Sequence, residues 1–140
     1  MANPHPSRAP TERFRLTSSD GLCLACARWD GEGPARSVIQ IAHGMAEHMG
    51  RYGSTIEVLV ASRLTVYAND HRGHGLTARA SSHLGDFGQG GFELLAQDMM
   101  RLTELARDEN PDLPLILLGT VWDPSPRKDA SSIAAMSSTD

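Results

Sequence analysis

The sequence lacks any apolar run of the roughly 20 residues that a helix needs to span a bilayer, which argues against a transmembrane segment. Its first ten residues, M-A-N-P-H-P-S-R-A-P, contain no apolar core of the kind found in secretory signals. Basic residues are also few, because 13 Lys and Arg stand against 17 Asp and Glu and form no stripe. We therefore expect a cytoplasmic protein with a Pro-rich, disordered leader over residues 1–11 and without nucleic acid as a partner.

Cysteine is nearly absent from the chain. The two cysteines, Cys23 and Cys26, have the spacing C-x-x-C, which would suit half of a zinc site or a redox pair. No second C-x-x-C is present to complete a zinc site. Residues three apart on a strand also point to opposite faces. The favoured interpretation is two small apolar residues in a strand, and we expect no metal and no cofactor.

The remaining pattern predicts an α/β fold in one domain. Strand-like stretches at Glu12 to Thr17 and Leu22 to Trp29 flank Asp20-Gly21, a strong turn signal, and together they predict an antiparallel hairpin. Three buried strands and two amphipathic helices then alternate, over residues 38–42, 51–63, 64–68, 92–107 and 113–118. This alternation predicts a parallel sheet with right-handed crossovers.

The second helix and the tail carry two further expectations. The buried stripe of the helix over residues 92–107 is expected to consist of Phe92, Leu95, Ala96, Met99, Leu102 and Ala106. After Gly119 the pattern stops, because residues 120–140 have no sustained period and little apolar content. We therefore expect a domain over residues 12–119 and an aberrant, disordered tail over residues 120–140.

A short polar segment, His43-Gly44-Met45, follows the buried strand over residues 38–42. In acyl-transfer enzymes a backbone N–H just after such a strand can stabilise an oxyanion. Gly44 would let the backbone approach a substrate closely, and Met45 would donate its backbone N–H. The alternative is an ordinary turn between a strand and a helix.

A second polar segment, Asp70 to Gly75, follows the strand over residues 64–68. Four histidines of these two regions could form a metal site: His43, His48, His71 and His74. A hydrogen-bonded loop in which Asp70 pairs with Arg72 is favoured, because no acidic or cysteine ligands complete a coordination sphere.

Three motifs follow one another in the chain: H-G-M-A-E-H-M-G-R-Y, N-D-H-R-G-H-G and P-D-L-P-L-I-L-L-G. Motifs of this kind in this order resemble the α/β-hydrolase superfamily. Within it, the resemblance is to the branch of monoacylglycerol lipases, lysophospholipases and serine aminopeptidase-like enzymes. The resemblance covers Glu12 to Gly119. It implies hydrolysis of a small ester or lipid by a Ser-His-Asp triad, without a cofactor, and an oxyanion donor at Met45. It also implies structural roles for the other motif positions: His43, Gly44, Glu47, His48, Asp70, His71, Arg72, Gly73, His74, Gly75 and Gly119.

The resemblance ends where the nucleophile of that family belongs. There, the strand ending in L-L-G leads into the elbow G-H-S-M-G, whose glycines permit a strained turn. Here Val121 occupies the nucleophile position, Asp123 replaces the second glycine, and no G-x-S-x-G occurs anywhere in the chain. The triad acid and histidine of the family come from strands beyond those seen here. We therefore expect the N-terminal portion of an α/β-hydrolase sheet, with the C-terminal half missing and no activity.

The start of the tail fits a shifted reading frame. One base added after the Gly119 codon lets the codons of T-V-W-D-P-S-P-R-K spell H-S-M-G-S-F-A-A-Q, and the junction of Trp122 and Asp123 then forces a glycine codon. The hypothesis is a single-base deletion in the gene or its sequence. The alternatives are a non-catalytic binding module on the same fold and a His-rich metal site. The nucleotide sequence separates the first two, and a metal assay tests the third.

Overall fold

The structure is a computed structural model, and it describes residues 8–43, 49–72, 77, 91–121 and 132–138. In chain order its elements are β1 (Glu12–Thr17), β2 (Cys23–Trp29), β3 (Ser37–Ala42), the 3-10 helix η1 (Met49–Tyr52), α1 (Gly53–Ala61), β4 (Leu64–Asn69), α2 (Gly91–Glu109), β5 (Leu115–Val121) and β6 (Ser132–Ser138). None of the helices among the described residues is long and apolar enough to cross a bilayer.

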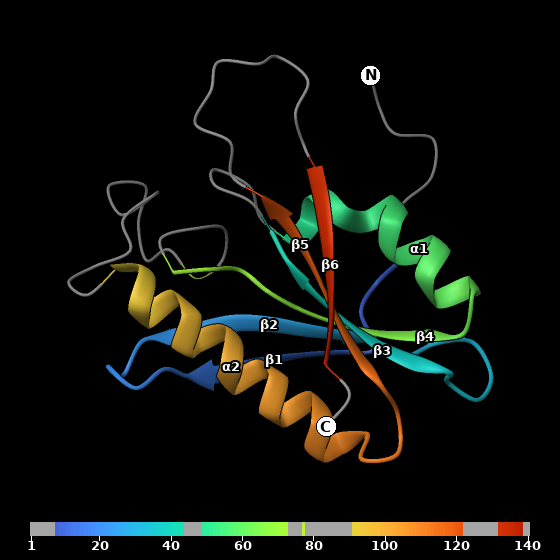
Figure 1. The fold of residues 1–140 in the computed structure, drawn as a ribbon, viewed down its shortest axis with the longest axis horizontal. Helices are drawn as coiled ribbons and strands as arrows, with labels where there is room; N and C mark the ends of the chain where they lie inside the picture. Colours follow the sequence, from blue (N-terminus) through green and yellow to red (C-terminus); the bar gives the residue numbers. More distant parts are fainter. Residues whose placement is uncertain (1–7, 44–48, 73–76, 78–90, 122–131, 139–140) are drawn as a thin grey trace.

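The described strands form one mixed sheet in the order β1-β2-β4-β3-β5-β6 (Figure 1). β1 and β2 make the predicted antiparallel hairpin, in whose turn Gly21 adopts a φ of 87° that favours glycine. β3 lies between β4 and β5 and is parallel to both. The α/β class and the order hairpin, strand, helix, strand, helix, strand are thus confirmed.

Helices α1 and α2 cover opposite faces of the sheet (Figure 1). Alternate residues of a strand point to opposite faces, so β3 directs Ile39 toward the layer of α1 and Val38 toward the layer of α2. Val60 of α1 and Leu102 of α2 are fully buried in these two layers. Burial of one such side chain contributes about 1.5–3 kcal/mol, so both faces stabilise the sheet.

Helix α2 follows the predicted stripe only in part. Leu102 and Ala106 are fully buried as expected, but Ala96 is exposed, and Asp98 is fully buried although it was not predicted. The buried side of α2 also makes polar contacts with the sheet. Gln40 of β3 donates through Nε2 to the Met99 carbonyl over 3.0 Å and accepts from Thr103 Oγ1 over 2.5 Å. The face that α2 turns to the sheet is therefore partly polar and hydrogen-bonded.

The segment after Gly119 differs from the expected absence of regular structure. β5 continues to Val121, and β6 pairs with it antiparallel from Leu115 opposite Ser138 to Val121 opposite Ser132. On the side of β5 that faces away from β3, the backbone N–H and C=O groups would be unpaired without a further strand. β6 pairs with these groups. Near the other end of the chain, Arg8 accepts through its carbonyl from Trp29 Nε1 over 3.0 Å. The domain limits at residues 12 and 119 remain predictions.

Replacement of Gly31 by alanine is expected to lower the free energy of unfolding by about 1–3 kcal/mol. A Cβ atom at this position would lie 2.9 Å from the Leu64 backbone nitrogen, and a backbone cannot move aside as a flexible side chain can. Gly119→Ala is the matched control, because its Cβ would meet nothing nearer than Ala42, at 3.9 Å. Urea denaturation measures both variants. Equal stability of the two would contradict the close approach of residue 31 to β4.

Candidate functional site

The topology brings two of the predicted motif segments to the same edge of the sheet, the one formed by the carboxyl ends of the parallel strands. Ala42 at the end of β3 lies opposite Asn69 at the end of β4 and opposite Gly119 in β5. The crossovers from β3 to β4 and from β4 to β5 leave in opposite directions, so the strand order reverses at β3. In open α/β sheets, ligands bind outside the carboxyl ends of the strands at such a point. The candidate site therefore lies at this edge.

Two buried histidines join the loops that follow β3 and β4. The backbone N–H of His71 donates to Nε2 of His43 over 2.8 Å, so this ring nitrogen is an unprotonated acceptor. The ring centroids are 4.2 Å apart at an interplanar angle of 44°. The two residues are only 4% and 5% exposed. The contact holds the start of the H-G-M segment against the loop after β4.

Asp70 binds three other parts of the chain. Its Oδ1 accepts from the Met49 N–H over 2.7 Å, and its own N–H donates to the Ala25 carbonyl over 2.9 Å. Its carbonyl accepts from Thr77 Oγ1 over 2.7 Å. The interpretation of residues 70–75 as a hydrogen-bonded loop is thus supported for the described residues. The expected pairing of Asp70 with Arg72 is wrong, because Arg72 pairs with other carboxylates.

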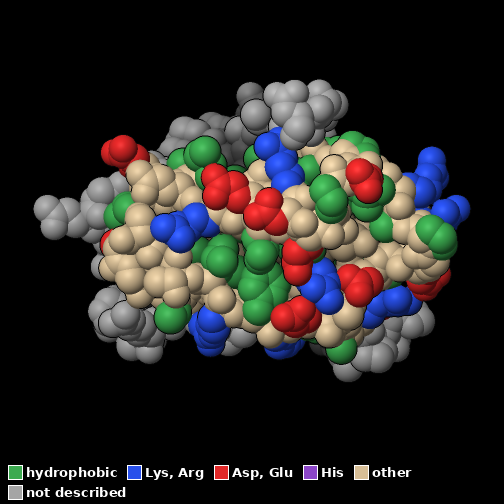
Figure 2. All heavy atoms as spheres, turned by 90° about the horizontal axis from the view of Figure 1, so that it is seen from below, with side chains coloured by type: hydrophobic (Ala, Val, Ile, Leu, Met, Phe, Trp, Pro, Cys, Tyr) green, Lys and Arg blue, Asp and Glu red, His purple; other side chains and the backbone are tan. Residues whose placement is uncertain are grey.

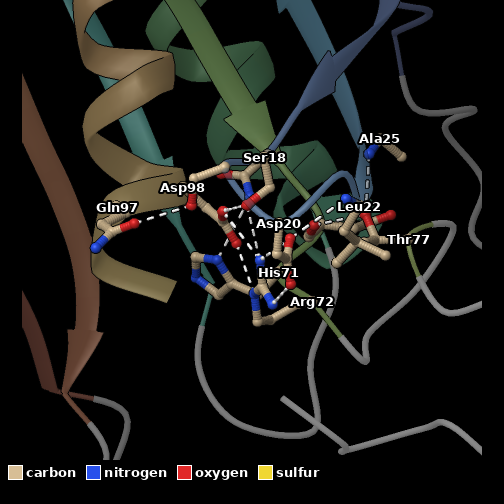
Figure 3. A network of polar contacts seen from close by, with 12 residues as sticks. Ser18, Asp20, Leu22, Ala25, His71, Arg72, Thr77, Gln97 and Asp98 are labelled. Atoms are coloured by element: carbon tan, nitrogen blue, oxygen red, sulfur yellow. Dashed lines mark hydrogen bonds and ion pairs between the residues drawn. The ribbon is translucent and has the colours of Figure 1, made fainter. Parts of the chain in front are cut away.

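Arg72 lies at the centre of a buried polar network (Figure 3). Its Nε donates to Asp98 over 2.8 Å, its Nη1 to Asp20 over 2.9 Å and its Nη2 to Ser18 Oγ over 2.8 Å. Ser18 Oγ in turn donates to Asp98 over 2.5 Å. The side chains of Arg72 and Asp98 are 3% and 0% exposed, whereas that of Asp20 is 41% exposed.

Asp20 and Arg72 favour the ionised state of each other. Hydrogen bonds from Arg72 hold the pKa of the Asp20 carboxyl well below its usual range. Hydrogen bonds to Asp20 and Asp98 raise the pKa of the Arg72 guanidinium above its ordinary value. Ser18, Asp20 and Asp98 are not predicted from the sequence as partners of Arg72. For Asp98 a signal exists, because it precedes Leu102 and Ala106 at intervals of four residues and so continues their stripe.

The two cysteines lie on β2 without a bond between them. Cys26 is buried and Cys23 is exposed, as expected for residues three apart on a strand. Burial, reinforced by the charge of Asp70, raises the pKa of the Cys26 thiol to about 12. Because only the thiolate is reactive, this environment disfavours redox chemistry at Cys26 near neutral pH.

Other predicted site residues fall outside the described part of the chain: Gly44, Met45, Glu47, His48, Gly73, His74 and Gly75. The oxyanion role of Met45 therefore stays a prediction. Within the residues that are described, no group of three or more His, Cys, Asp and Glu side chains could hold a metal ion. The four-histidine hypothesis includes His48 and His74, so the described residues do not test it.

The distribution of charge on one face of the molecule is relevant to the prediction that nucleic acid is not a partner. On the face shown in Figure 2, acidic and basic side chains of the described residues are intermingled around hydrophobic groups and form no continuous basic stripe. Proteins that bind nucleic acid through its phosphates usually present such a stripe. That nucleic acid is not a partner remains a prediction.

Comparison with known proteins agrees with this fold and with these motifs. A family model described as serine aminopeptidase, S33, matches residues 33–122. Monoglyceride lipase of Mus musculus is 31% identical over 115 residues, which are 81% of this chain and 36% of that protein. Monoacylglycerol lipase of Mycolicibacterium smegmatis is 38% identical over 99 residues, which are 71% of this chain and 34% of that protein.

A solved structure is similar in the same region. The thermostable carboxyl esterase from Bacillus coagulans, in complex with glycerol, superposes with a TM-score of 0.69 at 30% identity, over 74% of this chain and 34% of that one. The chain thus spans about a third of the length of these relatives. The family match covers more than half of the chain, and the sheet has the arrangement expected from the motifs. The chain therefore belongs to the serine aminopeptidase S33 family of α/β-hydrolases.

Proposed function

We propose that the chain is the N-terminal part of a serine esterase or lipase of the monoacylglycerol lipase type and has no hydrolase activity by itself. The observation that carries the proposal is the course of β5. It stays extended through Val121, at the nucleophile position, where it pairs with Ser132 of β6. A nucleophile elbow requires a sharp strand-to-helix turn at this place, and its serine would need a hydroxyl that valine lacks.

In the parent reaction, a serine would attack the ester carbonyl while a histidine takes its proton, and backbone N–H groups would stabilise the resulting oxyanion. This chain contributes the loop that carries Met45, two residues after the anchored His43. Loss of one oxyanion donor commonly costs about 10²–10³ in kcat, so such a loop matters for rate. It cannot replace the nucleophile or the base.

The hydroxyl contacts of three described serines support inactivity. Ser18 donates to Asp98, Ser19 to Gln97 and Ser62 to the Val58 carbonyl. A serine nucleophile instead needs to donate to a base such as histidine. None of these three hydroxyls has that arrangement.

The proposed substrate class of the parent enzyme is a small carboxylic ester or lipid. Two relatives are named as lipases of monoglycerides or monoacylglycerols, and one solved relative is named as a carboxyl esterase. The cytoplasmic location also belongs to the proposal, and fractionation of cells that express the tagged chain tests it.

A fluorophosphonate probe is expected to label no serine of the purified chain, and hydrolysis of a short-chain p-nitrophenyl ester should not exceed the buffer blank. The reason is that Val121, which has no hydroxyl, occupies the nucleophile position. An active serine esterase in the same solution serves as the positive control, and mass spectrometry locates any adduct. Covalent labelling of any serine would overturn the proposal.

A non-catalytic binding module on the same fold is the second candidate. The observation that favours it is β6, which pairs along the whole of β5 and gives this edge a partner from within the chain. If the tail is native, we expect the shifted reading frame after the Gly119 codon to reach a stop codon within a few codons. The nucleotide sequence of the locus therefore separates the two candidates.

A further inference from the structure

The buried pair of Arg72 and Asp98 connects the candidate site to helix α2. We propose that Asp98 is a positioning residue, which acts through Arg72 to hold the His71 N–H against His43, the residue that directly follows β3. The inference rests on the proposed function for its consequence, because His43 precedes the proposed oxyanion donor Met45 by two residues in the sequence. Its contacts, however, all lie among described residues.

Two consecutive residues of the loop after β4 bind the residue that follows β3 and the first residue of η1. On one side His43 accepts from the His71 N–H over 2.8 Å. On the other side the Met49 N–H donates to Asp70 Oδ1 over 2.7 Å. Asp70 and His71 therefore bind both described residues that border positions 44–48 in the sequence, His43 and Met49.

Arg72 follows directly after these two residues and fixes their chain to other elements. All three of its guanidinium nitrogens donate to side chains of α2 or of the turn between β1 and β2. Ser18 closes the network, because its hydroxyl accepts from Arg72 and donates to Asp98. Figure 3 shows these four side chains, Ser18, Asp20, Arg72 and Asp98, converging on one point. The loop cannot shift without breaking several charge-assisted hydrogen bonds.

The contacts form a closed circuit that starts and ends at β3. Gln40 of β3 binds α2 through the Met99 carbonyl, and α2 presents Asp98 one residue earlier. Asp98 binds Arg72, and the neighbouring His71 binds His43, which directly follows β3. β3 thus positions both partners of the His43–His71 contact. It directly precedes His43, and it is linked to His71 through Gln40, α2 and Arg72.

A contribution to folding stability does not by itself account for the buried ion pair of Arg72 and Asp98. Burial of two charges has a desolvation cost of several kcal/mol per ion, and an apolar pair of similar volume is often as stable. The planar guanidinium, however, sets direction as well as distance, which a hydrophobic contact does not. A role in positioning explains why a charged fork occupies this place.

The test is NMR on the full 140-residue chain with Asp98→Asn and Arg72→Lys. Each variant should change the imidazole nitrogen shifts of His43, because Nε2 loses its donor. Each should also raise the hydrogen-exchange rate of the His71 amide, relative to that of the buried Val66 amide in β4, by about tenfold. A purely structural role would raise both exchange rates by the same factor.

Tyr67→Phe is the control, since it removes a hydroxyl that binds Glu109 over 2.7 Å at the other end of α2. It should leave the His43 shifts and the exchange ratio unchanged. Asp20→Asn removes a half-exposed partner and provides a folded variant, with a smaller change in the same direction, if Asp98→Asn does not fold. Unchanged His43 shifts in folded Arg72→Lys and Asp20→Asn would overturn the inference. The readout involves no catalysis, so a failure of the proposed function leaves it intact.

Discussion

Insertion of one base directly after the Gly119 codon is expected to raise ester hydrolysis by the expressed protein from the blank level by roughly 10⁴-fold or more. The insertion changes Thr120→His, Val121→Ser, Trp122→Met and Asp123→Gly together. It should also open a downstream frame that supplies an acid and then a histidine. The effect is large because serine and base act as a unit, and neither contributes much without the other.

The restored serine would follow Gly119 by two residues. Gly119 lies opposite Ala42 of β3, which directly precedes the H-G-M segment in the sequence. For an elbow to form, β5 must end before residue 121 and its pairing with Ser132 must be lost. The backbone N–H after the new serine would then join that of Met45 as the second oxyanion donor. Hydrolysis of p-nitrophenyl esters and fluorophosphonate labelling measure the gain.

Val121→Ser alone is the matched control and should not rescue activity. The triad histidine that would act as its base is expected only from the shifted frame, and Asp123 still stands where the turn requires glycine. The first step of the test is to read the locus in the shifted frame. If that frame closes within a few codons, or lacks a later Asp or Glu and a later His, the deletion hypothesis is wrong. A binding module with its own tail is then the better account.

The sequence predicts the sheet well because the signals involved are local. Short apolar runs locate β3, β4 and β5 within a few residues, and Asp20-Gly21 predicts the turn of the hairpin. It does not predict β6, because Ser132–Ser138 has no strong period and forms a strand only against the free edge of β5.

The candidate site is predicted less completely than the sheet. The sequence places polar, glycine-containing segments directly after two strands, and their described residues, His43 and Asp70 to Arg72, follow β3 and β4 as expected. Their partners are not found, because Ser18 and Asp98 lie 80 residues apart in the chain and meet only in the folded protein. A neighbouring Asp and Arg suggest a pair in sequence, but the guanidinium of Arg72 reaches carboxylates from α2 and the hairpin turn instead.

Arg72→Met is expected to lower the free energy of unfolding by about 3–5 kcal/mol, a large part of the 5–15 kcal/mol of a typical domain. The Asp98 side chain is 0% exposed, so this variant leaves a buried carboxylate without its counterion. Arg28→Met is the control, because Arg28 pairs with Glu12 and Asp30, whose side chains are 51% and 53% exposed. Such exposed pairs contribute only about 0–1 kcal/mol. In urea denaturation, equal losses for Arg72→Met and Arg28→Met would contradict the buried pair.

The combined variant Ser18→Ala, Arg72→Met, Asp98→Leu separates stability from positioning. It removes the buried charges and the hydroxyl together, so no buried polar group of the network is left unpaired, and most of the lost stability should return. The exchange ratio of the His71 amide to the Val66 amide should nevertheless stay raised, because nothing then directs the loop that binds His43. A variant that recovers both stability and the wild-type exchange ratio would show that apolar packing alone positions this loop, and that the fork of Arg72 is not required.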